Sequence, residues 1–247
     1  MNLVIFSGTT EGRELSRCLA QRGAQVTVCV ATEYGREEQG EMPGITVSCG
    51  RKTVEQMRQL LCGMDLCIDA THPYAAVVTQ NVREACEKTG VPYKRLLRPR
   101  SADPSDGVFV QSAEQAAQWL SDREGNILLT TGAKELSKFA ALGGDRLYPR
   151  VLPLQSSLEN CEKAGIPRRN IIAMQGPFSL ELNVAMLHQY GIRWMVTKDG
   201  GATGGFPEKV QAAEQAGVPL VVIQRPEDDG AEFETILRDC EEMMGCR

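Results

Sequence analysis

The stretch Leu66–Ala75, with the sequence LCIDATHPYA, decides the interpretation of this 247-residue chain. Its apolar first half predicts a buried strand, Leu66–Asp69, and its second half a polar turn that carries His72, one of two histidines. We expect Pro73 at the first position of the next helix, with Thr71 or His72 as N-cap. Ligands of open α/β sheets bind outside the carboxyl ends of strands. The turn is therefore either a ligand site or a plain strand–turn–helix joint in which Asp69 binds nearby amides.

The same alternation of strand and helix continues on both sides of this stretch. Short apolar runs bounded by glycine and proline, alternating with amphipathic segments, indicate parallel strands buried on both faces. Because Asp122–Asn126 is a polar break, we expect two doubly wound α/β domains of mainly parallel sheet, residues 1–124 and 125–247. The expected strands are 3–6, 25–30, 45–48, 66–69, 91–97, 108–110, 127–132, 146–148, 171–174, 194–197 and 220–223. The expected helices are 11–22, 53–61, 74–89, 113–120, 179–190, 207–216 and 232–244.

The composition excludes several classes of partner. The net charge is -5, aromatic residues are 5% of the chain, and no Lys/Arg-rich run occurs, so nucleic acid is not an expected partner. No apolar run is long enough to span a bilayer, and the N-terminal residues lack the features of a signal peptide. We therefore expect a cytoplasmic protein without membrane contacts.

The nine cysteines are odd in number and include no CxxC pair. Cys29, Cys62, Cys67 and Cys86 lie in or beside apolar segments, which predicts reduced thiols in the core. With two histidines and no paired cysteines, no protein-bound metal is expected.

The segment Ser7–Arg13, SGTTEGR, follows the first strand and opens the first helix. Glycine lets the backbone approach a phosphate, and the free amides of a helix start carry partial positive charge. The segment is not a GxGxxG motif, and a capping box with Glu11 is the structural alternative. The second strand ends in Val30–Arg36, where Glu33 would suit a ribose hydroxyl and Thr32 and Arg36 a 2'-phosphate, so NADH and NADPH both stay open.

Two turns of the second half carry lysines at strand ends. Thr130–Leu136 includes Lys134, and Thr197–Lys209 combines four glycines with two threonines and two lysines. Such an amide-rich turn predicts an anion site, although glycines also serve tight turns. His188 is interpreted as a helix C-cap.

These motifs together resemble the precorrin-6A reductases of cobalamin biosynthesis, including the cobalt-precorrin-6A reductases of the anaerobic route. The most specific piece is Asp69–Ala75, DATHPYA. Ser7 and Asp199 depart mildly from the family's pattern. The other matching pieces, in the expected order, are Ser7–Arg13, Thr131–Gly132, Arg150–Pro153, Gln175–Phe178 and Thr197–Lys209.

The resemblance implies two Rossmann-like domains with an interdomain cleft, NADPH or NADH as cofactor, and a tetrapyrrole corrin precursor as substrate. The implied reaction transfers hydride to a double bond of the macrocycle beside ring D and adds a proton to the neighbouring carbon. The protein needs no metal or flavin of its own, because the nicotinamide carries the chemistry. Transient contacts with enzymes of neighbouring steps fit this setting.

The resemblance also implies roles for individual residues. The proton donor stays open among the catalytic candidates His72, Tyr74 and Lys198, and water. The predicted cofactor-binding residues are Ser7, Gly8, Thr9, Thr10, Glu11, Thr32, Arg36 and Thr71. Substrate carboxylates call for dispersed cations, which predicts substrate binding by Arg13, Lys134, Arg150, Lys198 and Lys209, with Arg98 and Arg100 between the halves. Gly200 and Gly201 of the glycine-rich turn are also predicted to bind substrate.

Two other functions stay open from the sequence: an NAD(P)H-dependent reductase of another small molecule, and a non-catalytic two-domain ligand-binding protein. Nicotinamide binding separates an enzyme from a receptor, and tetrapyrrole-dependent oxidation separates the two reductases. The presence of cobalt in the substrate and the oligomeric state are not determined by the sequence.

Overall fold

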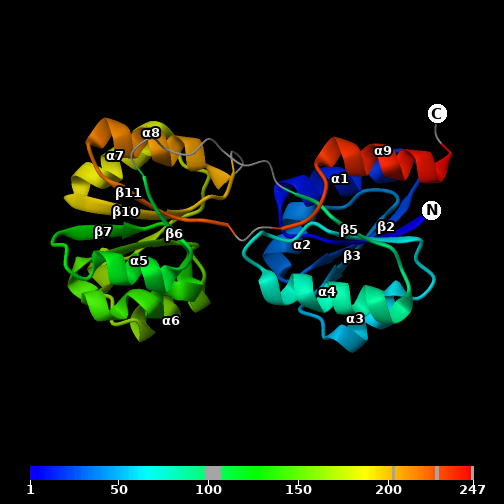
Figure 1. Cartoon of the computed structure of the whole chain (residues 1–247), viewed down its shortest axis with the longest axis horizontal. Helices are drawn as coiled ribbons and strands as arrows, with labels where there is room; N and C mark the ends of the chain where they lie inside the picture. The colour runs from blue at the N-terminus through cyan, green and yellow to red at the C-terminus, as the bar shows by residue number, and fades with distance from the viewer. Residues whose placement is uncertain (98–106, 202–203, 226–227, 246–247) are drawn as a thin grey trace. The chain divides into compact units, whose positions relative to one another are not determined.

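Two α/β units make up the chain, each with its own parallel sheet between layers of helices (Figure 1). The computed structural model describes residues 1–97, 107–201, 204–225 and 228–245. Unit 1 comprises Met1–Pro99 and Glu227–Arg247, and unit 2 comprises Arg100–Pro226. The predicted fold class, two doubly wound domains with parallel sheets, is confirmed.

The sheet of unit 1 has the strand order β3-β2-β1-β4-β5, with every neighbouring pair parallel. The chain winds outward from β1 to β3 and then crosses back to place β4 on the other side of β1. This reversal puts the carboxyl ends of β1 and β4 side by side, which is where ligands bind in such sheets. The strands are β1 Asn2–Phe6, β2 Gln25–Val30, β3 Ile45–Cys49, β4 Leu66–Asp69 and β5 Tyr93–Arg95.

Both faces of this sheet are covered by helices, which explains its uninterrupted apolar strands. Leu3 and Ile5 belong to the core beneath α1 and α9, whereas Val4 and Phe6 belong to the core beneath α3 and α4. In Figure 1 these two helix pairs lie on opposite sides of the sheet. The helices are α1 Thr10–Gln21, α2 Glu33–Gln39, α3 Val54–Leu61, α4 Ala76–Thr89 and α9 Phe233–Met244.

The sheet of unit 2 has the order β6-β11-β10-β7-β8-β9 and is also parallel. Helices α7 and α8 pack on one face, and α5 and α6 lie on the other with the 3-10 helix η1 (Figure 1). The strands are β6 Val108–Val110, β7 Asn126–Leu129, β8 Leu147–Val151, β9 Ile172–Ala173, β10 Ile192–Lys198 and β11 Leu220–Ile223. The helices are α5 Ala113–Leu120, η1 Ala133–Leu142, η2 Gly144–Arg146, α6 Gln155–Lys163, η3 Arg168–Asn170, α7 Leu180–Gln189 and α8 Phe206–Ala216.

The predicted strands and helices are present within a few residues of their expected bounds. The predicted helices do not include α2, α6 or the 3-10 helices η1, η2 and η3. In α2, with the sequence EYGREEQ, only Gln39 is buried, so the helix has no apolar stripe to mark it. Thr32 instead begins it as N-cap, accepting the amide N–H of Gly35 at 3.1 Å.

The predicted domain boundary at residues 124 and 125 is wrong. Strand β6 pairs with β11, so the segment before residue 124 belongs to unit 2. Helix α9 packs against α1, and Ile236, Leu237 and Cys240 enter the core of unit 1. The limits of the two units therefore follow strand pairing and burial. A polar break in the sequence does not show which strands pair.

The predicted helix start at Pro73 is also wrong. Helix α4 begins at Ala76 after Ala75, which makes no side-chain cap. The amide of Ala75 donates to the carbonyl of His72 at 2.8 Å, so Pro73 is the second residue of a β-turn. Proline suits both places because both require a φ near −65°.

Eight cysteines are described, and all are free thiols. Cys29, Cys67 and Cys86 are buried as predicted, and burial raises the pKa of Cys29 to about 11. Cys62 is exposed after the last turn of α3, which corrects its placement in the core. In the described part of the chain, no helix is long and apolar enough to cross a membrane.

Candidate functional site

The adjacent carboxyl ends of β1 and β4 are joined by a hydrogen bond. Thr9 is the N-cap of α1, accepts the amide of Gly12 at 3.1 Å and donates its hydroxyl to the carbonyl of Ala70 at 3.0 Å. A Cβ on Gly12 would lie 2.7 Å from both Ala70 Cβ and Ser7 Oγ. Glycine at position 12 therefore permits the close approach of α1 to both strand ends, a requirement that the sequence analysis did not identify.

A hollow of about 300 Å³ opens in front of the α1 N-terminus. Gly8 has φ +156°, and a Cβ there would meet no atom within 4 Å. The backbone at Gly8 is therefore open to a ligand. The lining residues are Ser7, Gly8, Thr9, Thr10, Arg13, Val30, Ala31, Thr32, Tyr34, Gly35, Glu38 and Gln39.

Five predicted cofactor residues, Ser7 to Thr10 and Thr32, thus share one hollow, whereas others do not line it. Glu11 lies in the first turn of α1, and Arg36 forms an exposed ion pair with Glu33 at 3.3 Å. Arg13, predicted to bind substrate, lines this hollow instead and pairs with Glu38 at 2.7 Å. The structure therefore groups Arg13 with the residues predicted to bind the cofactor.

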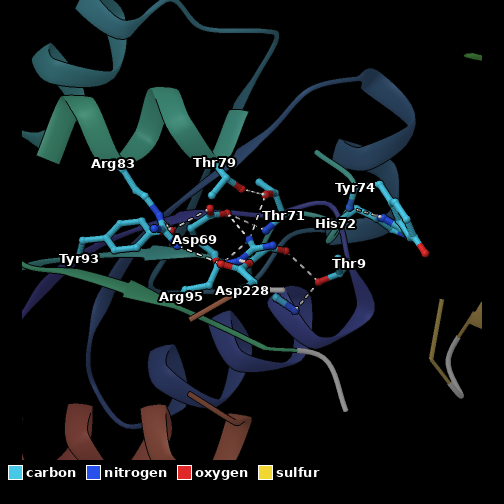
Figure 2. A network of polar contacts seen from close by, with 12 residues as sticks. Thr9, Asp69, Thr71, His72, Tyr74, Thr79, Arg83, Tyr93, Arg95 and Asp228 are labelled. Carbon is cyan, nitrogen blue, oxygen red and sulfur yellow. Dashed lines mark hydrogen bonds and ion pairs between the residues drawn. The ribbon is translucent and has the colours of Figure 1, made fainter. Parts of the chain in front are cut away.

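Behind the turn that follows β4 lies a buried ion-pair network (Figure 2). The Asp69 carboxylate, completely buried, accepts the amide of Thr71 at 2.9 Å and the hydroxyl of Tyr93 at 3.2 Å. Arg95 Nη1 lies 2.8 Å from Asp69 Oδ1 and donates to Thr71 Oγ1 at 3.1 Å. The Thr71 hydroxyl also lies 3.3 Å from that of Thr79. Asp69 therefore holds the backbone of the turn through the Thr71 amide, and Arg95 holds the Thr71 side chain.

The network ends on the segment that returns from unit 2 to unit 1. Asp228 pairs with Arg95 Nε at 2.6 Å and with Arg83 Nη2 at 2.9 Å. An isolated parallel β-bridge between Leu96 and Ala231 holds this segment beside β5. Burial and the Asp69 charge raise the pKa of Tyr93, so its hydroxyl stays a donor. Two carboxylates and two guanidinium groups balance one another in this network.

His72 and Tyr74 follow directly on the held turn. Their ring centroids are 5.4 Å apart with an interplanar angle of 30°, and the Tyr74 amide lies 3.4 Å from His72 Nδ1 (Figure 2). A neutral imidazole whose Nδ1 accepts a hydrogen bond carries its proton on Nε2. The rings of His72 and Tyr74 thus lie near each other, whereas the Thr71 hydroxyl joins the buried network with Arg95 and Thr79.

The carboxyl edge of the unit 2 sheet collects cationic side chains. Lys198, at the end of β10, pairs with Glu135 of η1, and Lys134 lies exposed on η1. Arg150, in β8, is 6% exposed and donates to Asn183 Oδ1 at 2.7 Å. Burial, and to a lesser extent the charge of Arg150, lower the pKa of Lys209 to about 8. Arg150 is therefore buried, and Lys209 is a half-buried lysine close enough to feel its charge.

In the described part of the glycine-rich turn after β10, two backbone amides already have hydrogen-bond partners. The amide of Gly201 donates to Asp199 Oδ1 at 3.0 Å, and that of Gly204 donates to the Gly201 carbonyl at 3.0 Å. Asp199 in turn pairs with Arg225 at 3.1 Å. Gly200 and Gly201 are buried. The prediction of an amide cradle is therefore corrected for Gly201 and Gly204, whose N–H groups already have partners.

Four residues of these networks were not predicted from sequence patterns: Arg95, Tyr93, Asp228 and Arg225. The signal available for two of them was the strand Tyr93–Arg95, which carries an aromatic and a basic residue on one face beside a strand that ends in aspartate. Asp228 had no local signal. Arg98 and Arg100, predicted to contact substrate, lie outside the described residues. Among residues 1–97, 107–201, 204–225 and 228–245, no three His, Cys, Asp or Glu side chains gather as metal ligands.

Residues 2–245 match the family described as Precorrin-6x reductase CbiJ/CobK. The cobalt-precorrin-6A reductase of Methanothermobacter thermautotrophicus is 36% identical over 92% of this chain and 77% of its own length. The cobalt-precorrin-6A reductase of Priestia megaterium is 34% identical over 98% of this chain and 96% of its own. Among solved structures, CobK precorrin-6A reductase matches with a TM-score of 0.77, covering 98% of this chain and 96% of that one at 22% identity. That structure supports the fold.

Proposed function

The chain belongs to the precorrin-6x reductase family CbiJ/CobK, and on this premise we propose that it reduces a precorrin-6A-type tetrapyrrole with NADPH or NADH. One hydride and one proton add across a carbon–carbon double bond of the macrocycle, giving the corresponding precorrin-6B and the oxidised nicotinamide. The cobalt form is the substrate to test first, because both relatives described above act on cobalt-precorrin-6A by name. The reaction is a step of corrin-ring biosynthesis.

The observation that carries the proposal is the hollow at the α1 N-terminus. Ser7, Gly8, Thr9 and Thr10 line it, and the helix start supplies partial positive charge for a pyrophosphate. Thr32 lies at the end of β2, where the adenosine ribose is held in such sheets. These residues fit a dinucleotide. When bound, the reduced nicotinamide supplies the hydride.

The turn Thr71–Tyr74 would bind the nicotinamide end and the reacting part of the macrocycle. Asp69 and Arg95 fix the start of this turn, so the side chains of His72 and Tyr74 extend from a rigid backbone. We assign the proton donor to His72, because imidazole ordinarily titrates near neutrality. Lys198 is a weaker candidate, since it is ion-paired with Glu135.

The tetrapyrrole carries many carboxylates, and the cations at the carboxyl edge of the unit 2 sheet would bind them. Arg150, Lys198 and Lys209 are the central candidates, with Lys134 at the exposed margin. Gly200 and Gly201 shape the turn that precedes α8. Guanidinium and ammonium groups bind carboxylates through charge-assisted hydrogen bonds.

The deciding experiment follows the reduced-nicotinamide absorbance under anaerobic conditions, with NADPH and NADH in turn. Cobalt-precorrin-6A and metal-free precorrin-6A are each supplied and each omitted. Oxidation that requires a tetrapyrrole is expected, and the rates give the preferred cofactor and the metal form. Cofactor binding without tetrapyrrole-dependent oxidation would mean a reductase of another substrate, and no cofactor binding would reject the reductase proposal.

A further inference from the structure

Arg150 is a buried cation that no carboxylate of the described chain neutralises. It is 6% exposed, and no Asp or Glu oxygen of the described residues lies within 4.0 Å of its guanidinium. Its contacts are neutral: Asn183 Oδ1 at 2.7 Å, Met186 Sδ at 3.7 Å, and the Phe178 ring, whose centroid is 3.9 Å away. Burial lowers the pKa of Arg150 to about 10. The surroundings therefore solvate the positive charge poorly.

Lys209 places a second positive charge beside the first. Its Nζ donates to the Gly204 carbonyl at 3.2 Å, and in the described chain it forms no ion pair. Burial is the largest cause of its lowered pKa, the charge of Arg150 is the second, and Glu208 opposes both with the smallest effect. The charge of Arg150 thus disfavours the protonated form of Lys209, which is itself half-buried.

The other buried arginines of the described chain show how the protein ordinarily treats such a group. Arg95, 3% exposed, pairs with Asp69 and Asp228, and Arg225 pairs with Asp199. A buried charge without a partner is strongly destabilising, so it persists where binding of an opposite charge repays it. Arg150 and Lys209 lack that partner within the described chain.

We propose that Arg150 and Lys209 form a carboxylate-binding site in unit 2 that takes one acidic side chain of the tetrapyrrole. The planar guanidinium binds a carboxylate through two parallel N–H···O bonds, and the ammonium adds a point charge. Phe178 and Asn183 hold the guanidinium in place. The inference rests on the proposed function for the identity of the ligand. The absence of a carboxylate beside Arg150 in the described chain is an observation that does not depend on that function.

The first test compares one substitution at two equally buried sites. Arg150→Met removes an unneutralised charge, and Arg95→Met removes a neutralised one. In the ligand-free full-length protein, the urea midpoint of Arg150→Met is expected to rise above wild type, whereas that of Arg95→Met is expected to fall. A fall for Arg150→Met comparable to that for Arg95→Met would mean that Arg150 is a structural residue and would overturn the proposal.

The second test measures binding of cobalt-precorrin-6A and of NADPH and NADH to wild type and to Arg150→Met. The Kd of the tetrapyrrole is expected to rise roughly tenfold or more, with the nicotinamide Kd within twofold of wild type. A larger effect on the nicotinamide than on the tetrapyrrole would assign the cations to a cofactor phosphate and overturn the proposal. Unchanged tetrapyrrole binding would also overturn it, while leaving the reductase function intact.

A third measurement tests Lys209 without a substitution. Acylation by acetic anhydride near pH 8, followed by peptide mass spectrometry, is expected to slow at Lys209 when cobalt-precorrin-6A is bound. Exposed Lys163 of α6 serves as the internal control and is expected to react as before. Equal acylation of Lys209 with and without the tetrapyrrole contradicts the site. Failure of wild type to bind any tetrapyrrole would instead reject the proposed function.

Discussion

Arg95 Nη1 lies 2.8 Å from Asp69 Oδ1, with 2% and 0% of the two side chains exposed. The same nitrogen donates to the Thr71 hydroxyl at 3.1 Å and to the Asp69 carbonyl at 3.3 Å. One guanidinium nitrogen therefore holds three atoms of the turn that leads to His72. Because Asp228 holds the other side of Arg95, the segment returning from unit 2 stabilises the turn as well.

Replacing Arg95 by methionine is expected to destabilise the protein by ~3–5 kcal/mol, because Asp69 and Asp228 lose the partner of a buried ion pair. Urea unfolding followed by circular dichroism measures the effect. Arg22→Met is the control, since Arg22 pairs with Glu241 at the surface of the same unit and its loss is expected to change little. Equal destabilisation by the two variants would contradict the importance of the buried network.

Gly12→Ala is expected to weaken nicotinamide binding roughly tenfold, or ~1.4 kcal/mol. The new Cβ would lie 2.7 Å from Ala70 Cβ, so α1 must move away from the turn after β4. Isothermal titration with NADPH and NADH measures the loss. The double variant Gly12→Ala, Ala70→Gly removes the Ala70 methyl group but leaves Ser7 Oγ 2.7 Å from the new Cβ, so partial recovery of affinity is expected. Without any recovery, the contact with Ala70 would not be the cause.

His72→Gln is expected to lower kcat by ~10²–10⁴-fold while leaving nicotinamide affinity within a few-fold, because the change removes a proton donor and not a phosphate contact. The pH dependence of kcat should lose the limb that reports the imidazole. Tyr74→Phe serves as the matched comparison on the same turn. A kcat for His72→Gln close to wild type would transfer the donor role to Lys198, Tyr74 or water.

The stability of the protein is expected to rise between pH 8 and 10 because of Lys209. In the folded protein the pKa of the Lys209 ammonium is about 8, whereas the ordinary pKa of lysine is 10.5. Between these values the unfolded chain binds more protons, so the free energy of unfolding increases with pH. At ~1.4 kcal/mol for each pH unit between the two values, the gain is at most ~3.5 kcal/mol.

Urea titrations of wild type and Lys209→Met at several pH values isolate this gain. The variant is expected to be the more stable protein at pH 7, and the difference should shrink as the pH approaches 10. A difference that stays constant over this range would mean that Lys209 keeps an ordinary pKa in the folded state.

Local patterns predicted much of the fold. Strand β4 and the polar turn after it were expected at Leu66–Asp69 because a run of buried apolar residues ends there in a side chain that binds its own backbone. Helix α2 escaped prediction because its one buried residue, Gln39, is polar. Pro73 was placed in a helix because a β-turn and a helix start require the same φ.

The sequence by itself determined the α/β class, the two parallel sheets and the residues that follow each strand, since period and turn chemistry are local properties. The tertiary structure alone decided which of these residues meet. The pairing of β6 with β11 and the packing of α9 on α1 set the limits of the units. Asp228 meets Arg95, and Arg150 meets Asn183, across 133 and 33 residues of chain. Strand order and burial create these contacts, and no pattern along the sequence encodes the distance between two such side chains.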